Sequence, residues 1–202
     1  RAGVWTVDDD GGPGVDFTDI QPAVLAAAPG DTILVAPGTY GTQCDIRVDK
    51  PVRILGTGAQ PSDVYLSCWN PSVVVVGVGG KHPVVLANLS GSGWVDVWDC
   101  QAPVLLIDIG LAVEAYKGRD VRVRNMSTPY TWVPYVSASS GTRVEAVSSA
   151  FQGRAGYDSD LGPGGGGGSG VTLFASRAHL AGCTSVGGKG GDVTSFSPFD
   201  FA

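Results

Sequence analysis

A short segment at residues 93–100, GWVDVWDC, combines aromatic and acidic side chains that could contact a ligand or a partner. If its two valines point into a core, their neighbours point outward, because side chains alternate along a β-strand. These outward residues are Trp94, Asp96 and Trp98. Two indoles beside a carboxylate suit a sugar-stacking platform, and they equally suit a protein interface, where tryptophan is enriched. Cover by an adjacent loop is the third interpretation.

Aromatic residues are also frequent in two later segments. Tyr130 and Trp132, in PYTWVPY, repeat the alternating pattern and favour an extended contact surface. The C-terminal residues SFSPFDFA contain Phe196, Phe199 and Phe201, which could dock on a neighbouring chain. Together these residues are the binding or interface candidates of the sequence.

Acidic clusters offer weaker candidates for chemistry. Asp158 and Asp160 with Arg154, in GRAGYDSDLG, could hold calcium beside a base, but we interpret the segment as a solvated loop. Residues 8–16, DDDGGPGVD, have the composition of a calcium loop. EF-hand spacing needs oxygen ligands at positions 1, 3, 5 and 12. Counting from Asp8 puts Gly12 at the fifth position, so we interpret this segment as a turn.

The overall charge excludes some function classes. The net charge is −6, and phosphate binding needs clustered lysine and arginine, so nucleic acid is not an expected partner. Arg122, Arg124 and Arg143 could form a basic stripe, although solvated strand charges explain them as well. His82 and His179 lack acid or cysteine at ligand spacing, so we expect surface or turn positions, no metal and no cofactor.

Short strands separated by turns dominate the chain. Apolar residues flank Arg47, Arg53 and Arg122 with period two, which predicts strands with one buried face. The longer apolar runs SVVVVGV and PVLLIDIG, which begin at Ser72 and Pro103, predict strands buried on both faces. No apolar run is long enough to span a membrane.

One helix is expected at residues 17–28, FTDIQPAVLAAA. Thr18 and Gln21 have capping-box spacing, and Phe17 could pack onto the first turn. The apolar face would contain Ile20, Val24 and Ala28. Residues 154–170 include GPGGGGGSG and predict a glycine-rich insertion loop, because repeat-like sequence resumes after it.

A weak internal repeat covers the second half of the chain. Three segments, AVEAYKGRDVRVRNM, YVSASSGTRVEAVSS and GVTLFASRAHLAGCT, each contain a strand, a turn of small residues and another strand. Val113, Val136 and Val171 are equivalent in them, at separations of 23 and 35 residues. A repeat of this length with an insertion at one place predicts a solenoid of about eight or nine coils in one domain, residues 1–202.

The N-terminal segment carries a resemblance to a known family. Residues 6–40, TVDDDGGPGVDFTDIQPAVLAAAPGDTILVAPGTY, and residues 50–58, KPVRILGTG, resemble the opening of pectin methylesterases in the pectate-lyase-like superfamily. The later coils are similar to those of secreted bacterial β-helix repeat proteins. The resemblance implies an all-β fold, a right-handed parallel β-helix with an N-terminal capping helix. The motifs close to QDT, DFIFG and LGRPW that serve catalysis in the esterases do not occur.

The four cysteines suit an oxidising compartment. Cys44 and Cys68 are 24 residues apart, close to one coil, so a disulfide could join them on neighbouring coils. Cys100 and Cys183 are about four coils apart and should not meet in a straight solenoid. We expect Cys183 in the core, and Cys100 either buried or free for a contact between chains.

These observations favour a secreted, non-enzymatic structural or interaction protein. The chain begins at Arg1 without a recognisable signal peptide, as a mature extracellular protein would. Its expected partner is another copy of itself, associating end to end into a fibre or surface layer, or a cell-surface polysaccharide. The alternative is a pectate-lyase-like polysaccharide-active enzyme, or a carbohydrate-binding module.

Overall fold

The computed structural model of the chain describes residues 2–41, 46–67, 72–126, 136–152 and 171–186, of which 151–152, 171–173 and 185–186 are described by their backbone alone. Within these ranges the chain is mainly β-strand, with one α-helix and one short 3-10 helix, η1 (Pro61–Asp63). Every strand pairing in this part of the chain is parallel. The expected all-β class and parallel sheet are confirmed.

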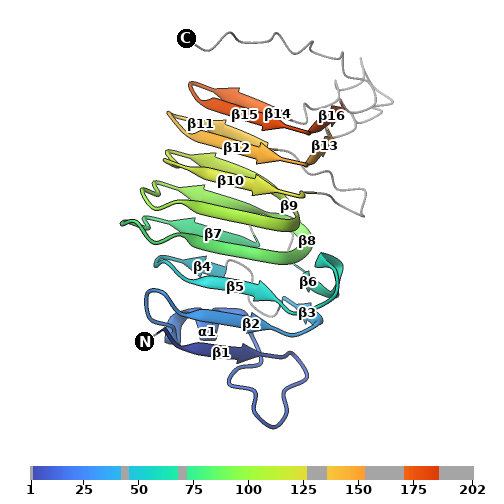
Figure 1. Ribbon diagram of the computed structural model, residues 1–202. Helices are drawn as coiled ribbons and strands as arrows, with labels where there is room; N and C mark the ends of the chain where they lie inside the picture. Colours follow the sequence, from blue (N-terminus) through green and yellow to red (C-terminus); the bar gives the residue numbers. More distant parts are fainter. Residues whose placement is uncertain (1, 42–45, 68–71, 127–135, 153–170, 187–202) are drawn as a thin grey trace, which may run out of the picture.

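The strands lie above one another in three stacks, which the chain visits in turn (Figure 1). The first stack contains β1 (Val4–Val7), β2 (Thr32–Val35), β5 (Arg53–Gly56), β10 (Val121–Arg124), β12 (Arg143–Val147) and β15 (Arg177–Ala181). The second contains β3 (Gly38–Tyr40) and β6 (Val64–Leu66). The third contains β4 (Ile46–Val48), β7 (Val73–Val76), β11 (Val136–Ser139) and β14 (Val171–Phe174). β13 (Ala150–Gln152) and β16 (Thr184–Val186) form a separate two-stranded sheet.

Two long strands pass through all three stacks and join them into one sheet. They are β8 (Val84–Trp98) and β9 (Val104–Tyr116). Their first residues pair in the first stack, Leu89 of β8 pairs with Ile109 of β9 between the corners, and their last residues pair in the third stack. The expectation of short strands separated by turns is wrong in this region. The backbone instead bends within continuous strands, with a register shift between Ser90 and Trp94.

The core lies between the stacks and is built from aligned aliphatic side chains. Ile33, Ile54, Leu86 and Leu106 follow one another in register through the first stack, and each is at most 1% exposed. This alignment follows from the parallel register, which places equivalent residues of successive strands about 4.8 Å apart. The alternation along β4, β5 and β10 predicted outward-facing arginines, and these are exposed: Arg47, Arg53 and Arg122.

The residues at the corners of the chain, most of them other than glycine, have left-handed backbone conformations. Asn88, Asp108, Asn125, Ser148 and Gly182 have positive φ where the chain leaves the first stack. Gly77, Asp99, Lys117, Ser140 and Ala175 do so where it leaves the third stack. A single left-handed residue turns the chain sharply, and Asn and Asp tolerate that conformation best among the larger residues. The side chains of Asn88 and Asn125 also form hydrogen bonds to residues of the preceding level of the stack. The Asn88 side chain donates to the Gly58 carbonyl oxygen at 2.7 Å.

The repeat register predicted from the sequence is confirmed. Val113 of β9 pairs with Val136 of β11, which in turn pairs with Val171 of β14. The expectation of strands buried on both faces is wrong. Val74 and Val76 of β7 are half-buried, as are the outer residues of the first part of β9, because both strands alternate between core and exterior.

The helix is shorter than expected. It is α1 (Ile20–Ala26), and Asp19 rather than Thr18 caps it, since the Asp19 side chain accepts a hydrogen bond from the Ile20 N–H at 2.7 Å. The expected apolar face does not extend to Ala28. The helix ends at Ala26, and beyond it Ala27 is buried whereas Ala28 is exposed. Phe17 packs against the core and lies 5.7 Å from the Trp5 ring. Within the described ranges, this helix of seven residues falls well short of spanning a membrane.

Candidate functional site

The outward residues predicted in GWVDVWDC lie on the last part of β8, in the third stack. Val95 and Val97 are fully buried, so Trp94, Asp96 and Trp98 point away from the core, as the alternation predicted. They are not equally accessible. Trp98 is 48% exposed, whereas Trp94 and Asp96 are half-buried. The exposed part of the expected strip is therefore Trp98.

Trp98 contacts an aromatic residue that the sequence interpretation missed. It lies opposite Tyr116 on β9, with ring centroids 4.8 Å apart and ring planes inclined by 33°. The Nζ atom of Lys117 lies 5.3 Å from the centre of the Tyr116 ring, within the range of a cation–π interaction. The segment AVEAY could have revealed this pair, because its order of acidic and aromatic residues matches that of WVDVW.

The same outer row continues toward the C-terminal strands. Tyr116 lies opposite Ser139 of β11, which lies opposite Phe174 of β14. Phe174 is 74% exposed. We call Trp98, Tyr116 and Phe174 the aromatic column. Its members come from three strands that are distant in sequence but neighbouring or next-neighbouring in the third stack.

Two carboxylates lie beside the aromatic column. Asp96 is opposite Glu114 of β9. Burial raises the pKa of Asp96, the charge of Glu114 raises it further, and a hydrogen bond with the Trp98 side chain lowers it. A carboxyl group beside a like charge in a half-buried position is a recognised feature of acid–base sites, although structural carboxylates show it too.

Trp94 has a different environment. Its Nε1 atom is buried and has no hydrogen-bond partner among the described residues, and the same is true of the Ser72 hydroxyl. The Trp94 backbone carbonyl accepts a hydrogen bond from the Ser72 N–H at 2.8 Å. Trp94 lies opposite Ala112 of β9, so it is not part of the aromatic column.

Several sequence candidates lie outside the described residues. They are Tyr130, Trp132, Phe196, Phe199, Phe201, Cys44, Cys68, Arg154, Asp158 and Asp160, together with the glycine-rich segment 154–170. The expected contact surface at these aromatic residues and the Cys44–Cys68 disulfide stay predictions.

The other two cysteines are free and far apart in the strand order. Cys100 is buried, and its Sγ atom lies 3.4 Å from the Val75 carbonyl oxygen. Burial raises the pKa of the Cys100 thiol. Cys183 is partly buried and packs against the core, as expected. The buried alternative for Cys100 is therefore confirmed, and a contact between chains through its thiol is wrong.

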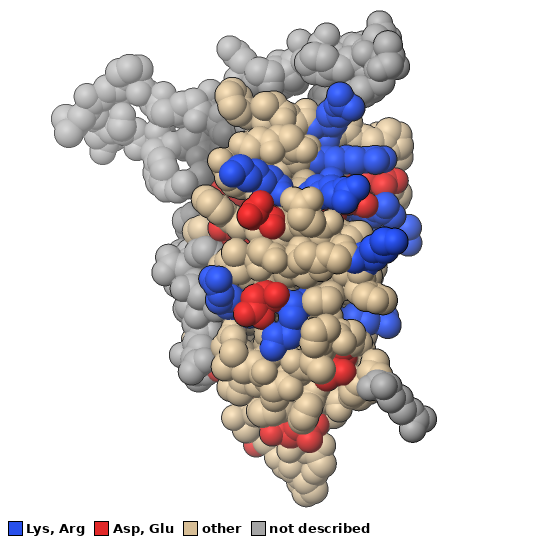
Figure 2. Space-filling model, turned by 90° about the vertical axis from the view of Figure 1, so that its left-hand side faces the viewer, with Lys and Arg blue, Asp and Glu red and all other residues tan. Residues whose placement is uncertain are grey.

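The interpretation of Arg122, Arg124 and Arg143 as solvated strand charges fits the structure better than a basic stripe, because Arg122 lies opposite Glu145 in the register. Arg122 and Arg124 on β10 and Arg143 on β12 are exposed. Arg122 forms an ion pair with Asp120 at 2.8 Å and lies 3.7 Å from Glu145. Figure 2 shows lysine and arginine side chains over the upper and middle parts of the face that it draws, with acidic side chains among them.

The acidic turn at residues 8–16 brings three carboxylates together. Ligand atoms of Asp8, Asp9 and Asp10 lie within 4.8 Å of one another. The Gly11 N–H donates to the Asp8 carbonyl oxygen at 3.0 Å, which confirms the expected turn. Exposed acidic groups of this kind are common without a metal, so the cluster carries no metal assignment. His82 and His179 are both exposed, as predicted.

Comparison with known proteins gives one partial likeness. No protein-family model and no solved structure matches the chain. A segment of 62 residues, 31% of this chain, is 42% identical to the F-box protein SKIP5 of Arabidopsis thaliana. The match covers 22% of that protein, so the chain is similar to about a fifth of its length.

Proposed function

We propose that this chain is a right-handed parallel β-helix that acts outside the cell as a non-enzymatic structural or interaction module. The three stacks of parallel strands and the repeat register support the β-helix, because a solenoid places equivalent residues of each coil in register. The resemblance of residues 6–40 to pectin methylesterases adds support for the scaffold. A scaffold does not determine an activity, so the function has to be argued from the surface.

The exposed contact of Trp98 with Tyr116 is the observation that carries the proposal. Large aromatic side chains are enriched where proteins bind partners, because they bury much area with few rotatable bonds. Here two of them lie on rigid neighbouring strands, and Phe174 extends the column. The facing sides of the Trp98 and Tyr116 rings pack on each other, and Lys117 lies near the Tyr116 ring. This arrangement leaves less open ring face for a sugar than a single flat platform would.

A polysaccharide-active enzyme is the second candidate, and Asp96 with Glu114 favours it. The two carboxylates lie at directly opposite positions of neighbouring strands, and glycoside hydrolysis uses a pair of carboxyl groups. The raised pKa of Asp96 would suit a general acid. Against this candidate, Asp96 is half-buried, and the esterase motifs are missing from the sequence.

Product assays separate these candidates. The purified chain is incubated with polygalacturonate and with methyl-esterified pectin, with and without calcium, and reducing ends, unsaturated ends and methanol are measured. We expect no product above that of Asp96→Asn. Accumulation of product by the wild type that Asp96→Asn abolishes would replace the proposal with the enzyme.

Binding is measured in parallel by sedimentation of the chain alone and of its mixture with polygalacturonate. We expect concentration-dependent association either of the chain with itself or of the chain with polygalacturonate. The double variant Trp98→Ala/Tyr116→Ala should lose at least part of that association. A matched control is Ser139→Ala, which alters the same outer row without removing an aromatic ring. Equal association by the double variant and the wild type in both arms would contradict the aromatic column as the contact surface.

A further inference from the structure

Charge is separated along the stack of strands. Residues 2–41, at the β1 end, contain six aspartates and no lysine or arginine. They are Asp8, Asp9, Asp10, Asp16, Asp19 and Asp31. The described residues from 117 onward contain six basic residues, Lys117, Arg119, Arg122, Arg124, Arg143 and Arg177, against two acids, Asp120 and Glu145. The first group lies at one end of Figure 1 and the second toward the other. Among the described residues, negative charge therefore gathers at the β1 end and positive charge toward the other end.

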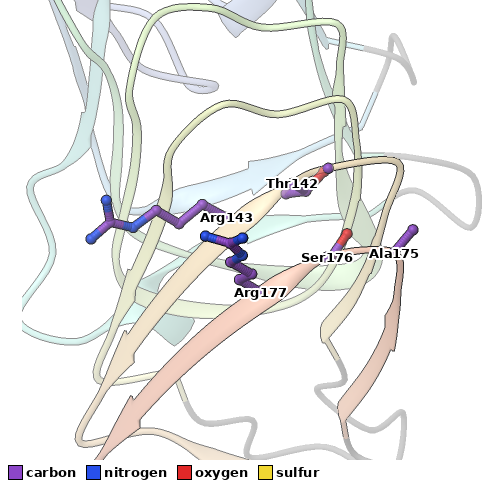
Figure 3. Close-up of a pocket in the computed structure, with 6 residues that line it drawn as sticks. Thr142, Arg143, Ala175, Ser176 and Arg177 are labelled. Carbon is purple, nitrogen blue, oxygen red and sulfur yellow. The ribbon is translucent and has the colours of Figure 1, made fainter. Parts of the chain in front are cut away.

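Two arginines at the basic end line a pocket. Arg143 begins β12 and Arg177 begins β15, and the two residues are directly opposite in the parallel register. The pocket encloses about 520 Å³, is open to solvent and is lined by Gly141, Thr142, Arg143, Ala175, Ser176 and Arg177 (Figure 3). We call this site the arginine corner.

Neither arginine of the corner forms an ion pair with an acid among the described residues. The nearest acid on the strand before them, Asp120, is bound by Arg122 at 2.8 Å. Two guanidinium groups carried by directly opposite strand positions repel each other and together favour an anion with more than one carboxylate oxygen. The polar groups of the corner are otherwise used, since the Thr142 and Ser176 hydroxyls donate to the Ser139 and Phe174 carbonyl oxygens.

The acidic end offers carboxylates in a preorganised turn. The loop of residues 8–16, which we call the acidic loop, projects from the strand stack beyond β1 (Figure 1). Asp9 is anchored because its Oδ2 atom accepts a hydrogen bond from the Thr39 N–H at 2.9 Å. Asp16 Oδ2 accepts from the Thr6 N–H at 2.8 Å, which closes the loop. Asp10 is exposed, so the loop holds clustered negative charge toward solvent at little cost in ordering on binding.

We propose that the arginine corner of one copy binds the acidic loop of a second copy. The two surfaces carry opposite charge and lie at opposite ends of the stack, so one chain cannot bring its own loop to its own corner. A long polyanion would have to pass acidic surface on a chain of net charge −6, whereas a short loop meets only the corner. Two antiparallel copies would form this contact twice, and staggered copies would repeat it along a fibre.

This inference rests on the proposed function, because it names the second copy as a partner of the interaction module. It uses a different surface from the aromatic column, so the two proposals fail separately. Association that Trp98→Ala/Tyr116→Ala abolishes and charge reversal leaves unchanged would overturn the inference and leave the proposed function standing. Product formation would overturn the proposed function whether or not copies associate.

The test is a charge swap between copies, read by sedimentation velocity in the presence of EDTA. Wild type is compared at about 0.01 M and 0.15 M salt, where the Debye length is about 30 Å and 8 Å. We expect association at low salt that weakens at least tenfold at the higher salt. Arg143→Glu/Arg177→Glu alone and Asp8→Lys/Asp10→Lys alone should each stay monomeric, and their mixture should associate. Asp9 is retained because it anchors the loop.

Controls separate this contact from general charge effects and from misfolding. Arg47→Glu/Arg53→Glu makes the same change in net charge at exposed positions of β4 and β5 and should associate as the wild type does. Arg143→Gln/Arg177→Gln removes the charges without adding acid and should weaken association, and far-UV circular dichroism reports folding of every variant. A monomeric wild type at low salt, failure of the mixture to associate, or binding of polyglutamate at the corner without self-association would each overturn the proposal.

Discussion

The indole of Trp98 and the phenol ring of Tyr116 are in direct contact across two neighbouring parallel strands, with centroids 4.8 Å apart. The two residues are 18 positions apart in sequence and share one outer row because Val97 pairs with Ala115 beside them. Their contact stabilises the third stack while leaving Trp98 48% exposed. It therefore links the packing of the strands to the surface that we propose for binding.

A double-mutant cycle measures this contact. Aromatic pairs contribute about 0.5–1.5 kcal/mol beyond the area that they bury. We expect Trp98→Ala and Tyr116→Ala each to lower the free energy of unfolding, with a coupling energy of about 1 kcal/mol between them in urea titrations. Additive effects would show that the rings do not stabilise each other. Trp98→Ala combined with Ser139→Ala provides a non-contacting reference pair.

The raised pKa of Asp96 predicts how the free energy of unfolding changes with pH. Its pKa is raised in the folded chain, mainly by burial and then by Glu114, so ionisation favours the unfolded state. The stability associated with this group is fully present below its unfolded pKa of about 3.9 and is lost as pH rises through the folded value. We expect Asp96→Asn to lose less stability than the wild type between acidic and neutral pH, as measured by urea midpoints. Parallel curves for the two proteins would contradict this account. Glu114→Gln should reduce the loss of stability between acidic and neutral pH by a smaller amount than Asp96→Asn does.

Gly77, at a corner after the third stack, allows the cost of backbone strain to be measured without side-chain crowding. Gly77 has φ of 65° and no atom within 4 Å of an added Cβ. An L-residue in this conformation costs about 1–2 kcal/mol, so we expect Gly77→Ala to lower the free energy of unfolding by about 1 kcal/mol. Gly79→Ala is the control, because Gly79 also has open space but no positive φ. A loss of stability in both variants would attribute the effect to something other than φ.

Tyr40 predicts an alkaline transition. Burial raises its pKa to about 12, with a further contribution from the charge of Asp9, and its hydroxyl donates to the Ala36 carbonyl oxygen at 2.8 Å. The associated stability is fully present below the unfolded pKa of about 10 and is lost as pH rises through about 12. Near-ultraviolet absorbance should show an ionisation step near this pH in the wild type that is lost in Tyr40→Phe. Ionisation of all tyrosines near their ordinary value would contradict the buried environment.

The strand pattern was predictable because period-two alternation depends only on which side chains face the core. The alignment of Val113, Val136 and Val171 gave the register of three strands correctly, because each pairing in a parallel stack joins equivalent positions. The bounds of α1 were less predictable. Asp19 and Thr18 are both good capping residues, so residue type alone does not determine which of them begins the helix.

The candidate site was predictable in part. Trp98 followed from alternation along one strand, whereas its contact with Tyr116 depends on pairing between strands, which local sequence does not specify. The arginine corner was harder still, since Arg143 and Arg177 are separated by 34 positions that include a long insertion. Their proximity becomes visible only when β12 and β15 are placed side by side.

The most direct test of the central claim is hydroxyl-radical footprinting of Trp98 across a concentration series of the chain, alone and with polygalacturonate. The account predicts that oxidation of Trp98 falls as a complex forms in one of the two series, while oxidation of the exposed His82 stays constant. Unchanged oxidation of Trp98 in both series, at concentrations where sedimentation detects complexes, would contradict a role of the aromatic column as the contact surface.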